Sequence, residues 1–171
     1  MIEKKCCFIG HRNTPKTEKL QERVKSLVKE LIEKENVRTF LFGSKSAFDD
    51  LCFDIVTELK AEYPDIRLVY ARNMYPVLSD YYEEYLLEFY DETYFPKRIE
   101  NAGRASYVER NQEMIDASDF CVFYYDENYR PIERAKGFGG IPRSGTAVAF
   151  SYAERKSKRG APLTVINLYK T

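Results

Sequence analysis

Short apolar runs alternate along the chain with longer segments of helical period. The apolar runs predict strands over residues 6–9, 37–42, 66–70, 120–125 and 163–168. Between them, apolar side chains at helical spacing predict helices over residues 14–35, 48–59, 80–90, 106–117 and 144–158. Strands separated by helices indicate a Rossmann-like α/β fold, a three-layer sandwich with a mainly parallel sheet of about five strands.

Local signals suggest where three of these helices begin. Thr14 followed by Pro15 predicts an N-cap and a first helical position, and Ser106 with Glu109 forms a capping box. Ser144 opens the final helix. We expect the helix over residues 80–90 to turn three side chains toward the core: Tyr82, Leu86 and Phe89.

Length and composition indicate the number of domains and the cellular compartment. A chain of 171 residues, 44% of them hydrophobic, suggests one globular domain over residues 1–171. The four cysteines include no Cys-x-x-Cys pair, so we expect buried thiols in a reducing compartment. No apolar run approaches membrane-spanning length, which favours a cytoplasmic protein without a membrane partner.

Charge and histidine content narrow the function classes. The 27 basic and 27 acidic residues cancel, which argues against an extended nucleic-acid surface but permits a small basic pocket. His11 is the sole histidine, so a His-rich metal site is excluded. We therefore expect no metal and no resident cofactor.

The loop after the first strand carries Gly10, His11 and Arg12. In parallel α/β sheets, ligands bind at the carboxyl ends of strands near the point where strand order reverses. Glycine allows close backbone approach there, and a following helix start favours an anion. We favour a ligand-facing loop. An ordinary turn with solvated polar side chains is the alternative.

The loop after the second strand offers Gly43, Ser44 and Asp49. Gly43 and Ser44 are predicted to approach a ligand, while Asp49 either contacts the ligand or serves the first turn of its helix. Phe48 is predicted to be a core anchor rather than a stacking platform.

Arg110 and Asn111 lie on the helix before the fourth predicted strand. Helical spacing puts Arg110 and Met114 on one face, with Asn111 beside them. A basic and an amide group directed at the sheet edge would bind a sugar or phosphate. A surface arginine and a backbone-bonded amide form the alternative.

A glycine-rich segment leads into the last predicted helix. Glycines leave backbone donors accessible, and hydroxyl groups with a positive helix end add to phosphate binding. The segment is neither a Walker A sequence nor the Gly-x-Gly-x-x-Gly of dinucleotide enzymes, and a structural loop is the alternative. Its candidate ligand contacts are Gly139, Gly140, Ser144, Gly145 and Thr146.

Tyrosines gather between residues 73 and 95. Tyr81, Tyr82 and Tyr85 would line a pocket wall or a subunit interface, or else pack in the core or lie on an ordinary surface.

The ordered set of motifs resembles the SLOG superfamily, most closely its YpsA-like branch of small bacterial proteins. The residues that carry the resemblance are Cys7–Arg12, Gly43, Phe48, Asp49, Arg110, Asn111, Met114, Ser118, Asp119, Ser144–Thr146, Ala149 and Ala153. The resemblance spans nearly the whole chain. It implies a Rossmann-like domain whose loops bind a nucleotide or a small nucleotide-derived ligand. By analogy, it also makes a homodimer possible.

Two enzyme groups are more distantly similar at the last helix: the LOG phosphoribohydrolases and the nucleoside deoxyribosyltransferases. Both carry Gly-Thr-x-x-Glu, whose glutamate acts on the glycosidic carbon, but here Ala149 follows Gly145 and Thr146 at that position. The resemblance thus favours a nucleotide-binding or sensing domain without N-glycosidase activity. The alternatives are an enzyme that cleaves an N-glycosidic or phosphate ester bond with Asp49 or Asp126, and an interaction module with a vestigial pocket.

Overall fold

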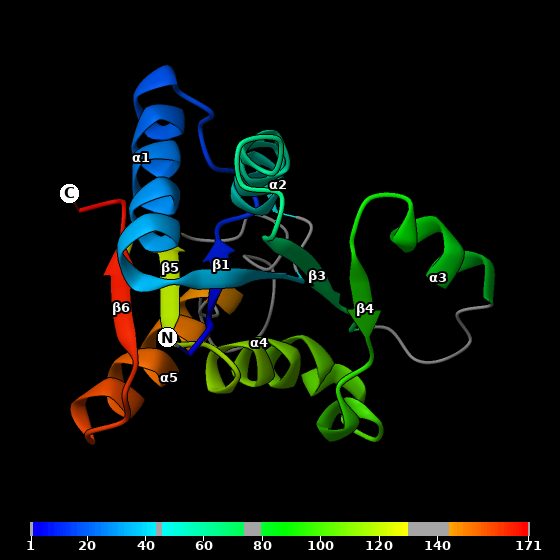
Figure 1. The fold of residues 1–171 in the computed structure, drawn as a ribbon. Coiled ribbons are helices and arrows are strands. Elements are labelled where there is room, and N and C mark those ends of the chain that lie inside the picture. The colour runs from blue at the N-terminus through cyan, green and yellow to red at the C-terminus, as the bar shows by residue number, and fades with distance from the viewer. Residues whose placement is uncertain (1, 44–45, 74–79, 130–143, 171) are drawn as a thin grey trace.

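The computed structural model describes residues 2–43, 46–73, 80–129 and 144–170 (Figure 1). The described strands form one six-stranded parallel sheet in the order β4-β3-β2-β1-β5-β6. Their bounds are β1 (Lys4–Gly10), β2 (Val37–Phe42), β3 (Arg67–Ala71), β4 (Glu92–Tyr94), β5 (Phe120–Tyr124) and β6 (Thr164–Asn167). The predicted Rossmann-like α/β architecture is confirmed, and β4 is an additional strand.

Helices cover both faces of this sheet. The helices are α1 (Glu18–Glu35), α2 (Ala47–Leu59), α3 (Asp80–Leu87), α4 (Ser106–Asp116) and α5 (Gly145–Lys158), with 3₁₀ turns η1 (Lys97–Ile99) and η2 (Gly103–Ala105). The first core cluster joins α1 and α2 to one sheet face, and the second joins α4 and α5 to the other. In Figure 1 the sheet lies between these two pairs, while α3 stands to one side beyond β4.

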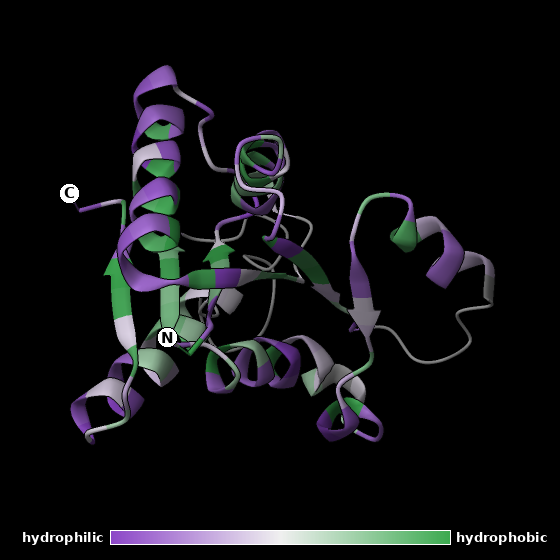
Figure 2. Ribbon diagram, viewed as in Figure 1, coloured by the Kyte–Doolittle hydropathy of each residue, from purple (hydrophilic) through white to green (hydrophobic). Residues whose placement is uncertain are grey.

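Side-chain alternation along β1 explains the two core clusters. Cys6 and Phe8 contribute to the cluster with α1 and α2, and Cys7 and Ile9 contribute to the cluster with α4 and α5. Because successive strand residues point to opposite faces, a strand buried on both sides is apolar throughout. Figure 2 shows β1, β5 and β6 as largely hydrophobic, whereas α1 carries hydrophilic residues on its outer side.

Strand order reverses between β1 and β5. The chain builds outward from β1 to β4 and then returns to place β5 on the other side of β1. Ile9 lies opposite Phe123, and Gly10 lies opposite Tyr124. The residues that follow these two strands therefore meet at the carboxyl edge of the sheet, at the position where such folds bind ligands.

The predicted N-cap at Thr14 is wrong. Helix α1 begins at Glu18, and Thr17 is its N-cap, because the Thr17 side chain accepts a hydrogen bond from the Leu20 amide at 3.1 Å. The hydroxyl of Thr14 is buried and donates to the carbonyl of His11 at 2.8 Å. Thr14 thus closes the loop after β1 rather than starting the helix.

The predicted capping box at Ser106 and Glu109 is also wrong. The 3₁₀ turn η2 leads directly into α4, so Ser106 already has helical dihedral angles, with φ −55° and ψ −39°. An N-cap residue needs an extended backbone, which Ser106 lacks. Glu109 instead accepts a hydrogen bond from Arg98 Nε at 3.0 Å.

The prediction for the helix over residues 80–90 is partly right. Leu86 is buried and Tyr82 packs against the core, but Phe89 is 51% exposed. Helix α3 ends at Leu87, so the helical period that would bury Phe89 stops before that residue.

All four cysteines are free and buried, as predicted. Cys7 and Cys121 face each other across β1 and β5, and their sulfur atoms lie 3.4 Å apart. No helix in the described part of the chain combines the length and apolar character needed to cross a membrane.

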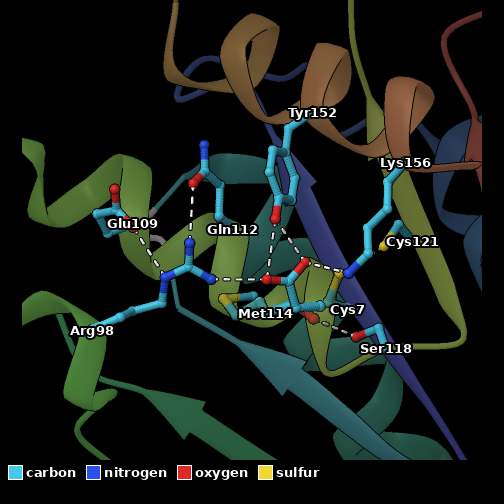
Figure 3. A network of polar contacts seen from close by, with 10 residues as sticks. Cys7, Arg98, Glu109, Gln112, Met114, Ser118, Cys121, Tyr152 and Lys156 are labelled. Carbon is cyan, nitrogen blue, oxygen red and sulfur yellow. Dashed lines mark hydrogen bonds and ion pairs between the residues drawn. The ribbon is translucent and has the colours of Figure 1, made fainter. Parts of the chain in front are cut away.

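A polar network holds α4 against α5 and η1 (Figure 3). Arg98 donates to Glu109, Gln112 and Asp116, and Asp116 also accepts from Tyr152 and Lys156. Burial alone would raise the pKa of Asp116, but the donors from Lys156, Tyr152 and Arg98 outweigh it and hold that pKa below its usual value. The network positions α4, which supplies Arg110 to the candidate site.

Candidate functional site

His11 links the loops that follow β1 and β5. The side chain is 2% exposed, and its Nε2 accepts a hydrogen bond from the backbone N–H of Asp126 at 2.8 Å. The imidazole ring also stacks on Tyr129, with centroids 3.9 Å apart and planes 17° apart. Because Nε2 accepts a hydrogen bond, the proton of the neutral ring is on Nδ1.

The surroundings of His11 favour its neutral form. Burial lowers the pKa of His11 below 6.5, and the nearby Asp126 carboxylate opposes that shift only in part. Among the described residues, Nδ1 is buried without a hydrogen-bond partner. An unsatisfied buried donor is costly, so this nitrogen offers a hydrogen bond at the reversal point of the sheet.

Gly10 and Arg12 have different surroundings in the same loop. A Cβ atom at Gly10 would lie 2.4–2.5 Å from Phe48, so the core fills the space beside this glycine. Phe48 is fully buried, which confirms its prediction as a core anchor. Arg12 has an exposed side chain, and its carbonyl accepts from the Ala47 amide at 2.9 Å, which ties the loop to the start of α2.

Arg110 crosses from α4 to the end of β2. It is 2% exposed, Nη1 donates to the carbonyl of Gly43, and Nε donates to Asn111 Oδ1 at 3.1 Å. A Cβ atom at Gly43 would lie 2.7 Å from both Arg110 Cδ and Met114 Sδ. Gly43 thus makes room for a buried guanidinium group, and the alternative of a surface arginine is wrong.

The charge on Arg110 has a buried acidic neighbour. Burial lowers the pKa of Arg110, whereas Tyr70 and Asp49 act in the opposite direction. Asp49 is 2% exposed, and its backbone N–H donates to the N-cap oxygen of Ser46 at 3.0 Å. Arginine stays protonated in proteins, so this part of the edge holds a desolvated positive charge in the electrostatic field of a buried carboxylate.

The start of α5 has the features of an anion-binding helix end. Ser144 is the N-cap, and its hydroxyl accepts from the Ala147 amide at 3.0 Å. Gly145 is exposed, and a Cβ atom added there would meet no atom within 4 Å, while Thr146 is buried. The first amides of a helix lack intrahelical acceptors and lie at the positive end of its dipole.

Three predicted contacts, Ser44, Gly139 and Gly140, lie outside the described residues. Asp126 is half-buried, and its Oδ1 accepts from the Asn128 amide at 2.9 Å. Asp49 lies in the first turn of α2, which follows β2, whereas Asp126 lies in the loop after β5.

Side-chain hydrogen bonds join some of the described candidates into two groups. One group links His11 to the loop after β5, and the other links Gly43, Arg110 and Asn111 at the end of β2. Among the described residues, no group of three or more His, Cys, Asp or Glu side chains is arranged to hold a metal ion.

Two aromatic residues of the site were not predicted from the sequence. Tyr129 covers the ring of His11, and Tyr107 lies against the guanidinium of Arg110. The spacing of three residues between Tyr107 and Arg110 on one helix was the available signal. The predicted tyrosines on α3 differ among themselves, because Tyr81 and Tyr85 are exposed and Tyr82 packs on the core.

A comparison with known protein families matches the part of the chain that forms most of the carboxyl edge of the sheet. A family model described as the YspA SLOG family matches residues 7–134, which include the loops after β1, β2 and β5. The match ends before Ser144 and the start of α5. No curated protein matches the chain. Since the match spans more than half of the chain, the protein belongs to the YpsA family of SLOG proteins.

Proposed function

We propose that this protein binds a nucleotide or a small nucleotide-derived molecule at the carboxyl edge of its sheet and acts as a sensor. Membership of the SLOG family suggests a nucleotide-related binding or modifying domain. The observation that carries the proposal is the buried Arg110, held on the Gly43 carbonyl at the end of β2, the strand next to β1. A desolvated guanidinium at this position is suited to an anionic ligand.

The surrounding groups suggest which residues contact the phosphate, the sugar and the base of the ligand. The start of α5, with Ser144, Gly145 and Thr146, would hold phosphate through backbone amides and hydroxyl groups. Arg12 and Arg110 would supply positive charge. We assign sugar or base contacts to two other residues, Asn111 and Asp49, and a donor contact to His11.

The proposal does not include cleavage of the glycosidic bond. Ala149 stands where the glycosidase-like relatives carry glutamate, and it is 2% exposed within the second core cluster. A methyl group neither attacks an anomeric carbon nor stabilises its positive charge. The free, buried cysteines support a reducing, cytoplasmic setting for this sensor.

A thermal-shift panel tests the proposal with NAD, ADP-ribose, cyclic nucleotides and nucleoside monophosphates. Free ligand at 100 times its dissociation constant stabilises the folded state by about 2.7 kcal/mol. We expect at least one ligand to raise the melting temperature of the native protein. Thr146→Val, which removes one hydroxyl at nearly constant volume, should weaken that shift, and Thr164→Val at an exposed position on β6 is the control outside the site.

Product analysis of the same mixtures separates binding from catalysis. The expected result is intact nucleotide, and release of free base or phosphate would favour the enzymatic alternative. In that case, Asp49→Asn tests the buried carboxylate beside Arg110, because loss of product formation would assign it a part in the reaction. A panel without any thermal shift would contradict the proposed function.

A further inference from the structure

Tyr107 is an exposed aromatic side chain at the candidate site. It lies in the first turn of α4 and is 59% exposed. The guanidinium carbon of Arg110 lies 5.7 Å from the centre of its ring. Arg110 itself is 2% exposed, so a buried cation supports a ring that is open to solvent.

The position of Arg110 is fixed independently of this ring. Its Nη1 donates to the Gly43 carbonyl and its Nε donates to Asn111. A guanidinium held at two points gives the adjacent tyrosine ring a rigid support at low entropic cost. By contrast, no cation of the described residues lies over the ring of Tyr81, which is 80% exposed on α3.

The direction of α4 places Tyr107 at the ligand-binding edge. Helix α4 precedes β5 in a parallel sheet, so it begins near the carboxyl edge and runs back toward the opposite edge. Tyr107 lies one helical turn closer to the start of α4 than Arg110, which already reaches the end of β2. The ring is therefore near the outer rim of the candidate site.

We propose that Tyr107 is the stacking platform for the base of the bound nucleotide, with Arg110 as the positioning residue behind it. This inference rests on the proposed nucleotide-binding function and adds the element that recognises the base. An aromatic ring with one side supported and the other exposed is the arrangement on which a nucleobase stacks.

The chemistry of stacking defines the preference that results. Every base has a π face, so a single ring favours ligands with a base over those without one and discriminates weakly among bases. A purine offers the larger face. The native protein should thus bind adenosine 5′-monophosphate more tightly than ribose 5-phosphate, which shares the sugar and the phosphate but lacks the base.

Calorimetric titration with these two probes tests the role of the ring. Tyr107→Leu should weaken adenosine 5′-monophosphate binding by about 5- to 150-fold, the range for stacking on one aromatic ring. Its effect on ribose 5-phosphate binding should be small by comparison. Tyr107→Phe should retain most of the affinity, and Tyr81→Leu on α3 is the control for removal of an exposed tyrosine.

Fluorescence gives a readout at the ring itself, because the chain contains no tryptophan. Tyr107→Trp creates a single reporter that adenosine 5′-monophosphate should quench in a saturable manner, whereas ribose 5-phosphate should not. Tyr81→Trp should respond to neither probe.

The outcomes distinguish this inference from the function on which it rests. Equal affinity of the native protein for both probes, or equal losses for both in Tyr107→Leu, would overturn the stacking role and leave phosphate-sugar binding intact. Failure of both probes and of the whole nucleotide panel to bind the native protein would overturn the proposed function and the stacking role together.

Discussion

The imidazole Nε2 of His11 accepts a hydrogen bond from the backbone N–H of Asp126 at 2.8 Å, across the point where strand order reverses. This bond joins the loops after β1 and β5, which are separated by more than 100 residues in the chain. It also determines which nitrogen of the neutral ring is protonated: Nε2 is the acceptor, so the proton is on Nδ1. His11, in the loop after β1, thereby holds the loop after β5 in place.

Removal of the imidazole should destabilise the protein. In His11→Ala the amide of the half-buried Asp126 loses its acceptor, which costs about 1–3 kcal/mol, and the stack on Tyr129 is lost as well. The free energy of unfolding in urea measures this loss. The matched control is Asn13→Ala, an exposed position in the same loop, which should change stability little. Equal stability of the two variants would contradict the structural role of His11.

Stability should also depend on pH through His11. Burial lowers its folded-state pKa below 6.5, so the unfolded chain binds more protons as pH falls through 6.5 toward that lower value. The free energy of unfolding therefore decreases over this window, with a slope of at most about 1.4 kcal/mol per pH unit, and then levels off below the folded-state pKa.

His11 is the sole histidine, so His11→Gln provides the reference for this measurement. The difference in unfolding free energy between native protein and His11→Gln should become smaller as pH falls from 7.5 to 5. A difference that stays constant over this range would show that burial does not lower the pKa of His11.

The sequence was informative where a signal was local and repetitive. The five predicted strands correspond to β1, β2, β3, β5 and β6, because each lies in a short run of mostly apolar residues. β4 was not predicted, because it has only three residues, Glu92–Tyr94, and these do not form an apolar run. Long-range contacts also escaped prediction: only the fold shows that Arg110 is buried against Gly43 or that Asp126 donates to His11.

Gly10 and Gly145 should respond oppositely to alanine. The added methyl group in Gly10→Ala would lie within 2.5 Å of the buried Phe48 ring, and such overpacking costs about 1–3 kcal/mol. In Gly145→Ala the methyl group meets no atom within 4 Å, and alanine is the better helix former, so stability should hold or rise. Urea unfolding of both variants measures the contrast. A harmless Gly10→Ala would contradict the close packing at the end of β1.

Ala149→Glu should destabilise the protein without creating a glycosidase. Ala149 packs in the second core cluster with Ile9 and Phe123, where a carboxylate loses its hydration among apolar side chains. We expect a loss of several kcal/mol in urea unfolding, larger than for Val148→Glu at the half-buried neighbouring position. Release of free base from adenosine 5′-monophosphate by Ala149→Glu would contradict this placement and show that the side chain reaches the ligand.

Nuclear magnetic resonance of the His11 imidazole tests nucleotide binding at the carboxyl edge most directly. Because the chain has one histidine, its ring signals report on the meeting point of the β1 and β5 loops without ambiguity. Titration with a ligand that raises the melting temperature should shift these signals in a saturable manner, with the dissociation constant found by calorimetry. Signals that remain unchanged while the ligand binds, or throughout a titration with the whole nucleotide panel, would contradict a nucleotide site at this edge.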